Sequence, residues 1–125
     1  YIVEEGEAKK RIAEGCDDQM WIADAPAVIV AVGYNVPFSR GGYMGDMSFM
    51  MDVSIAFTQL ILAARAEGLG TCWIGAFSND KVKEAMGLPD DENVVAVTPI
   101  GYPDKGVFSE NTSRKTLEEI TEWVK

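Results

Sequence analysis

The sequence predicts an α+β or α/β domain in which helices pack on a sheet in about three layers. Two uninterrupted apolar runs, 27–32 and 94–97, are typical of strands covered on both faces. A long apolar segment from about 46 to 67 predicts a helix that is buried on most sides. Strands and helices alternate along the chain, but it holds too few βαβ units for a strictly parallel, doubly wound sheet.

The first part of the chain predicts one strand and two helical segments before the central strand. Residues 1–3 are typical of a strand, and the charged segment 4–14 predicts a helix. We expect a second short helix or turn over 17–23. Pro26 then separates this turn from the strand over 27–32, which we place centrally in the sheet.

The middle of the chain predicts a long loop followed by the dominant helix. Residues 33–45 contain breakers of any periodicity, and loops of this length usually have a function. The helix over 46–67 is apolar enough to suggest a membrane span. However, Asp52, Gln59 and Arg65 lie within any window of about 20 residues, which argues against that interpretation.

The last part predicts two more helices around the second buried strand. A short extended stretch over 71–74 precedes cap residues at 78–80 and a helix that ends at Met86. The strand over 94–97 is expected to run to Pro99. A capping box that begins at Thr116 predicts a terminal helix as far as Val124.

Composition excludes several classes of function. The 125 residues suit a single domain spanning 1–125, and 11 basic against 20 acidic residues give a net charge of −9. Such a domain is a poor match for nucleic acid or an anionic membrane. The absence of histidine rules out a Ser-His-Asp or Cys-His nucleophile within the chain. Cys16 and Cys72 alone cannot close a zinc site, and we expect both to be reduced thiols in a cytoplasmic protein.

The segment 68–77 is the most specific feature of the sequence. Its glycines would let the backbone approach a flat ligand, and exposed N–H groups there could hydrogen-bond the ring. A helix C-cap followed by an edge strand would give the same spacing. We assign no catalytic side chain and no metal ligand, so a demanding reaction would need a cofactor.

The chain resembles the nitroreductase family over about 25–125. The helix over 52–67 that runs into Gly68-Leu69-Gly70-Thr71-Cys72-Trp73-Ile74-Gly75 is similar to that family, as are 81–89 and Pro99-Ile100-Gly101-Tyr102-Pro103. The resemblance implies an α+β, three-layer α/β/α sandwich with a mixed, largely antiparallel sheet and a long buried central helix. It also implies a homodimer with the flavin site at its interface.

The resemblance further implies a cofactor and its contacts. FMN would be reduced by NADH or NADPH and reoxidised by a small-molecule electron acceptor such as a nitro compound or a quinone. The residues expected to bind the cofactor lie in two segments: Trp73, Ile74, Gly75 and Ala76 beside the ring, and Arg114 and Lys115 at the phosphate. The substrate-binding candidates are Phe38, Arg40, Tyr43 and Met44, which belong to the long loop.

Two features of the family pattern are missing from the sequence. Neither the basic phosphate clamp of the family's first helix nor the Pro-Trp segment that follows it is present, so we expect the chain to be an incomplete, C-terminal portion. Two alternatives stay open. One is a flavin-binding relative with another chemistry, such as dehalogenation or flavin processing. The other is a non-catalytic fragment that dimerises without flavin.

Overall fold

The computed structural model describes residues 1–35, 45, 47–104 and 113–124. Four strands form one sheet in the order β1-β2-β4-β3. The strands are β1 (Ile2–Val3), β2 (Ala27–Gly33), β3 (Gly70–Thr71) and β4 (Asn93–Gly101). The helices are α1 (Gly6–Gly15), the 3-10 helix η1 (Met20–Asp24), α2 (Ser48–Ala66), α3 (Asn79–Met86) and α4 (Leu117–Ile120).

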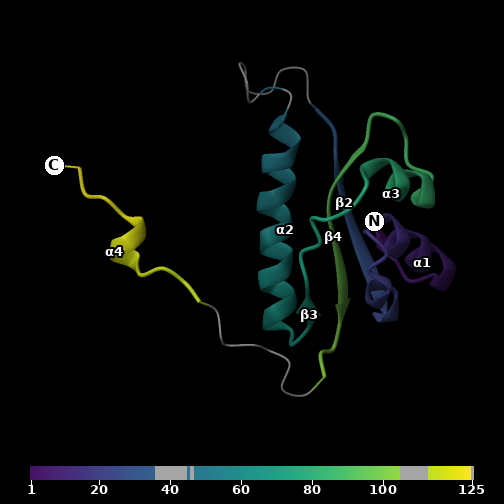
Figure 1. The fold of residues 1–125 in the computed structure, drawn as a ribbon, viewed down its shortest axis with the longest axis horizontal. Helices are drawn as coiled ribbons and strands as arrows, with labels where there is room; N and C mark the ends of the chain where they lie inside the picture. Colours follow the sequence, from purple (N-terminus) through teal and green to yellow (C-terminus); the bar gives the residue numbers. More distant parts are fainter. Residues whose placement is uncertain (36–44, 46, 105–112, 125) are drawn as a thin grey trace.

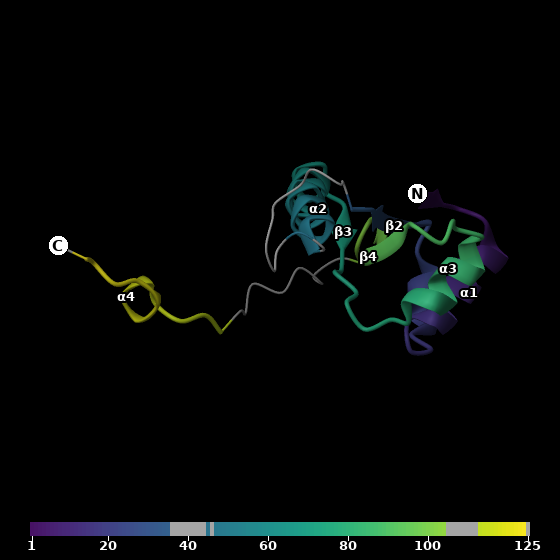
Figure 2. The ribbon, with the colours of Figure 1, turned by 90° about the horizontal axis from the view of Figure 1, so that it is seen from above.

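The elements form three layers. Seen from above, α2 covers one face of the sheet, and α1 and α3 lie together on the other (Figure 2). This arrangement confirms the α+β class and the sandwich. The sheet was expected to be mixed and largely antiparallel, and all three strand pairs among the described residues are antiparallel. Because β2 and β3 both run antiparallel to β4, they run parallel to each other, and α2 is the crossover connection between them.

The principal core lies between the sheet and the α1/α3 layer. Alternate residues of β2 point into it, and Val28 and Val30 are fully buried. Across this core the fully buried aliphatic side chains are Ile12, Ile22, Val82 and Val97. The period-2 burial of β2 shows that its two faces meet different helical layers.

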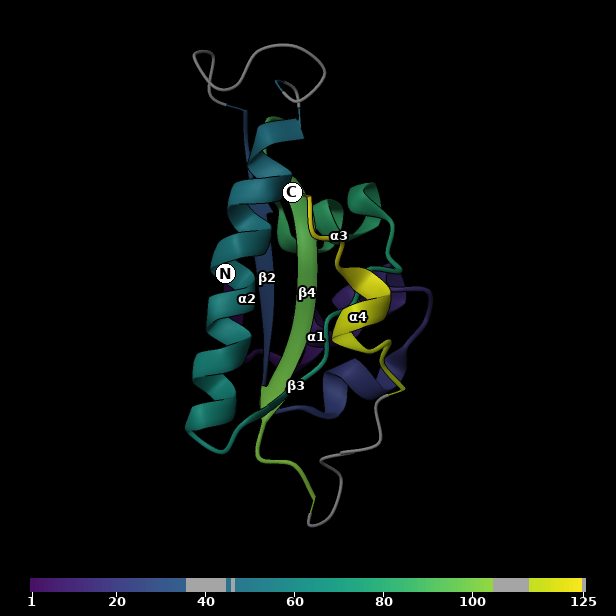
Figure 3. The ribbon, with the colours of Figure 1, turned by 90° about the vertical axis from the view of Figure 1, so that its left-hand side faces the viewer.

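Helix α2 packs alongside β2 and β4, as Figures 1 and 3 both show. A side chain at Gly33 would clash with Phe49 and Val53, so the glycine permits this close approach. Of the 19 residues in the helix, only Ser48, Phe57 and Ala64 are buried. The expected buried central helix is therefore buried on one side only, because the sheet covers one stripe of a helix that is apolar nearly all round.

By length and composition, α2 would be long enough to cross a membrane, and it is the one such helix in the described residues. Its contacts argue for the sandwich layer instead. One stripe lies against the antiparallel sheet, and the helix carries Asp52 and ends with Arg65 in its last turn.

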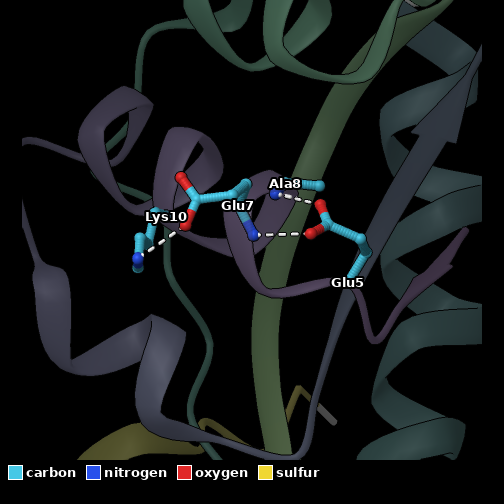
Figure 4. A network of polar contacts seen from close by, with 4 residues as sticks. All are labelled: Glu5, Glu7, Ala8 and Lys10. Carbon is cyan, nitrogen blue, oxygen red and sulfur yellow. Dashed lines mark hydrogen bonds and ion pairs between the residues drawn. The ribbon is translucent and has the colours of Figure 1, made fainter.

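Local capping explains where two helices begin. The Glu5 carboxylate accepts hydrogen bonds from the N–H groups of Glu7 (2.9 Å) and Ala8 (2.6 Å), while Lys10 pairs with Glu7 at 2.7 Å (Figure 4). The two backbone bonds lower the pKa of Glu5, since they stabilise its charged form. Ser78 caps α3 in the same way by accepting the N–H of Lys81.

Helices α1, η1 and α2 begin two or three residues later than the sequence predicts, and three boundaries after α2 also differ. β4 continues through Pro99, which pairs with Val28, and ends at Gly101. The stretch 71–74 is a strand only as far as Thr71, followed by an isolated bridge at Ile74. The Thr116 capping box is confirmed, but α4 ends at Ile120 rather than Val124. A helix this short is only marginally stable unless other elements pack against it, and no described element contacts α4 extensively, which explains why the helix does not continue.

Candidate functional site

The segment after β3 is fixed to β4 by hydrogen bonds on both sides of Trp73. The N–H of Cys72 donates to the hydroxyl of Thr98 at 3.0 Å. The N–H of Ile74 donates to the carbonyl of Val97 at 2.8 Å, and the N–H of Val97 donates back to the carbonyl of Ile74 at 3.3 Å. Residues 72–74 therefore continue the edge of the sheet although they form no regular strand.

The same bonds fix the direction of the next backbone donor. The carbonyl of Ile74 points toward β4, where it accepts the N–H of Val97. In a trans peptide, the carbonyl and the following N–H point in opposite directions. The N–H of Gly75 is therefore directed away from β4, out of the sheet edge. Gly75 is exposed, and its N–H has no hydrogen-bond partner in the part of the chain that the structure describes.

The segment is also held on its C-terminal side. The N–H of Ser78 donates to the carbonyl of Gly15 at 2.8 Å. The amide Nε2 of Gln19 donates to the carbonyl of Ala76 at 3.5 Å and to that of Cys16 at 2.9 Å. Gly75 and Ala76 thus lie between two attachment points, one on β4 and one on the α1–η1 turn. Backbone donors held in this way need little reorganisation when a ligand binds.

The side chains on either side of the segment face opposite layers. Ile74 is buried in the α1/α3 core, with 4% of its surface exposed. Trp73 lies on the α2 side, where its ring meets Phe57 edge-to-face, with centroids 4.8 Å apart and an interplanar angle of 89°. Trp73 remains 39% exposed, so part of the indole is available to a ligand.

The backbone at Gly75 leaves room for a ligand. Among the described residues, a Cβ placed there would meet only the Trp73 indole, with Nε1 at 3.8 Å and Cδ1 at 3.9 Å. Packing against this part of the chain therefore does not require the glycine. An open backbone, an outward N–H and an adjacent aromatic ring fit the edge of a flat heteroaromatic ligand that carries hydrogen-bond acceptors.

The basic candidates lie elsewhere in the structure. Arg114 and Lys115 are exposed, immediately before α4. Figures 1 and 2 show α4 standing well clear of α2 and the sheet, at the other end of the molecule from α1 and α3. The structure thus brings Trp73, Ile74, Gly75 and Ala76 together but leaves the basic pair apart from them within one chain.

Four sequence candidates cannot be placed. Phe38, Arg40, Tyr43 and Met44 lie outside the described residues. Within the described ranges, no group of three or more His, Cys, Asp or Glu side chains could hold a metal ion. Both cysteines are free, with Cys16 buried and Cys72 exposed.

Sequence reasoning missed three residues that shape this segment: Gln19, Phe57 and Thr98. Thr98 could have been noticed, because it is a polar residue that directly follows the buried run 94–97. Phe57 is one apolar residue among many in α2, and its pairing with Trp73 depends on how the helix is rotated. Nothing in the sequence pointed to Gln19, because its hydrogen bond to Ala76 depends on the shape of the turn that follows α1.

The comparisons with known proteins agree on one family. A model described as the nitroreductase family matches residues 2–102. A protein of Archaeoglobus fulgidus, named "Putative NADH dehydrogenase/NAD(P)H nitroreductase", is 30% identical over 124 residues, which cover 95% of this chain and 69% of that protein.

Two solved structures are similar to the fold. A nitroreductase family protein from Clostridium novyi NT has 34% identity and a TM-score of 0.75, and the match covers 83% of this chain and 60% of that one. A Staphylococcus epidermidis protein titled "putative NAD(P)H:FMN oxidoreductase" has 17% identity and a TM-score of 0.81, with 99% of this chain and 74% of that one covered. The chain therefore spans well under the full length of these relatives.

Proposed function

The chain belongs to the nitroreductase family, and from that premise we propose that it acts in an FMN-dependent oxidoreductase. The electron donor would be NADH or NADPH, and the acceptor would be a small molecule such as a nitro compound or a quinone. Relatives with names of this kind support the reaction class. The observation that carries the proposal is the outward N–H of Gly75, which has no hydrogen-bond partner among the described residues and lies on a backbone segment attached at both ends.

The chain's own contribution to the chemistry is electrostatic and positional. The N–H of Gly75, with that of Ala76 next to it, would donate hydrogen bonds to the ring edge of FMN. Fixed donors stabilise negative charge that develops on a ring, and they favour the reduced cofactor for the same reason. Bound FMN would supply the two-electron chemistry of a ping-pong hydride transfer between nicotinamide and acceptor. The side chain of Ile74 is buried in the core beneath this backbone and so anchors the segment that carries the donors.

Arg114 and Lys115 would bind the FMN phosphate, since exposed cations without an ion pair among the described residues can neutralise a dianion. They stand away from Gly75 in one chain, so we propose that they reach the site of a second copy. The loop residues Phe38, Arg40, Tyr43 and Met44 remain our candidates for contacts with the acceptor or the nicotinamide.

A homodimer is supported by the outer face of α2. Exposed apolar side chains recur along it at helical spacing: Met47, Met50, Met51, Ile55 and Leu62. Thr58 and Gln59 interrupt this apolar face between Ile55 and Leu62, but a surface with so many exposed apolar side chains is typical of an association surface. An isologous dimer would cover both copies of the helix at once and would bring each C-terminal segment near the partner. The two free thiols support a cytoplasmic setting.

An FMN titration of the purified chain tests the proposal. We expect saturable binding, seen as a perturbed visible spectrum and quenched flavin fluorescence. Anaerobic addition of NADH or NADPH should then bleach the visible bands. No binding would overturn the flavin proposal, whereas binding without bleaching would contradict only the nicotinamide step.

A further inference from the structure

The indole N–H of Trp73 is a hydrogen-bond donor with no partner in the described part of the chain. An indole nitrogen can only donate, and a donor beside a polar backbone is normally satisfied by a partner or by water. Trp73 is 39% exposed, so solvent or a ligand can reach the group.

The orientation of the ring places this donor beside Gly75. The atoms of the indole nearest to a Cβ at Gly75 are Nε1, at 3.8 Å, and Cδ1, at 3.9 Å. The pyrrole edge, which carries the N–H, therefore faces Gly75. This contact places the side-chain positions of residues 73 and 75 on the same side of the backbone. Trp73 thus borders the same open space into which a side chain at position 75 would project.

Phe57 fixes this orientation from α2. It is 3% exposed and meets the Trp73 ring edge-to-face at 4.8 Å. Edge-to-face pairs are favoured over a stacked sandwich and add to the stability of the packed arrangement. The backbone on each side of Trp73 is attached to β4 through Cys72 and Ile74. The indole is therefore held by the sheet through its backbone and by α2 through its ring.

We propose that the indole N–H of Trp73 is a second hydrogen-bond donor to the ligand held at Gly75, and that Phe57 is the positioning residue that aims it. The inference rests on the proposed function, because the ligand is taken to be FMN. It adds a side-chain donor to the backbone donors. It also means that ligand binding depends on how α2 packs, because Phe57 on this helix orients the indole. Two donors that converge on one ring edge discriminate against a ring whose edge has no acceptor.

The test compares FMN dissociation constants of matched variants of the full chain. Trp73→Phe keeps an aromatic ring but removes the N–H, and Phe57→Leu keeps apolar volume but removes the ring that orients the indole. Trp21→Phe is the matched control, since Trp21 is also partly exposed but lies in η1. We expect both test variants to bind FMN about two- to tenfold more weakly, the range for one lost hydrogen bond or aromatic contact, and the control to be unchanged.

A second measurement shows whether the Trp73 indole donates a hydrogen bond to the ligand or only packs against it. In ¹⁵N-labelled protein the three tryptophans give three indole N–H signals, and the signal that Trp73→Phe removes belongs to Trp73. FMN should shift this signal and slow its exchange with solvent, and Phe57→Leu should broaden or move it before FMN is added. An unshifted, fast-exchanging Trp73 signal in FMN-saturated protein would overturn the inference and leave the flavin proposal standing. No FMN binding by the unaltered chain would overturn both.

Discussion

The N–H of Cys72 donates a hydrogen bond of 3.0 Å to the hydroxyl of Thr98, whose side chain is fully buried. The hydroxyl in turn donates to the carbonyl of Pro99 at 2.9 Å. A buried hydroxyl that both accepts and donates is a satisfied group, and it ties the segment after β3 to β4 without a regular strand. The donors of the candidate site follow this attachment by only a few residues.

Replacing this hydroxyl should loosen the attachment. Thr98→Val keeps the shape of the side chain but leaves the N–H of Cys72 without its acceptor, so we expect the free energy of unfolding to fall by about 1 to 2 kcal/mol. Thr98→Ser keeps the hydroxyl and should lose less. Urea denaturation of the two variants measures the difference. Equal stability of the valine variant and the unaltered protein would show that the bond contributes nothing.

The two cysteines should differ sharply in reactivity. Cys72 is exposed and should be alkylated quickly in the native protein, whereas Cys16 is buried and should react only after unfolding. Iodoacetamide labelling followed by mass spectrometry counts the modified thiols. Cys72→Ser serves as the control and should abolish the fast reaction. Rapid labelling of Cys16 in that variant would contradict its burial.

Cys16 should also affect stability at alkaline pH. Burial, followed by the nearby Asp17 charge, raises the pKa of the Cys16 thiol from 9.0 to about 11. The folded state therefore retains the proton more tightly than the unfolded state. Its contribution to stability is complete below about pH 9 and is lost as the pH rises toward 11. Between pH 8 and 11, the midpoint temperature of thermal unfolding should therefore fall less steeply for Cys16→Ala than for the unaltered protein.

Self-association should depend on the outer face of α2. Leu62 is 65% exposed in the single chain, so Leu62→Glu should fold normally but weaken the proposed dimer by about tenfold or more. Ile2→Glu is a suitable control, because Ile2 is comparably exposed but belongs to β1, at the opposite edge of the sheet from β3. Sedimentation velocity reports both results. If Leu62→Glu associates as strongly as the control, the interface lies elsewhere.

Much of the fold followed from local signals that act over a few residues. The cap at Ser78, the end of α3 at Met86 and the buried run of β2 could all be predicted, since each depends on neighbours in the sequence. The length of α4 was not readable. Its capping box is correct, but the helix needed a packing partner to continue, and the described part of the chain provides none.

The candidate site was predictable only in part for the same reason. The glycines of 68–77 indicated where the backbone could meet a ligand, but the direction of the Gly75 N–H depends on its pairing with Val97, which is distant in sequence. The orientation of Trp73 depends on Phe57 in another layer. The apolar character of α2 was correctly recognised, yet its pattern did not show that the sheet would bury only one side of the helix.

The most direct measurement of the central claim is an FMN titration of Gly75→Ala against Gly6→Ala. Neither substitution disturbs the described part of the chain, where a methyl at position 75 meets only the indole at ordinary contact distance and one at position 6 meets nothing within 4 Å. If FMN lies against Gly75, the dissociation constant of Gly75→Ala should rise roughly tenfold, equivalent to about 1.4 kcal/mol, while Gly6→Ala binds as the unaltered protein does. Equal affinity of the two variants would contradict the placement of the flavin at this backbone.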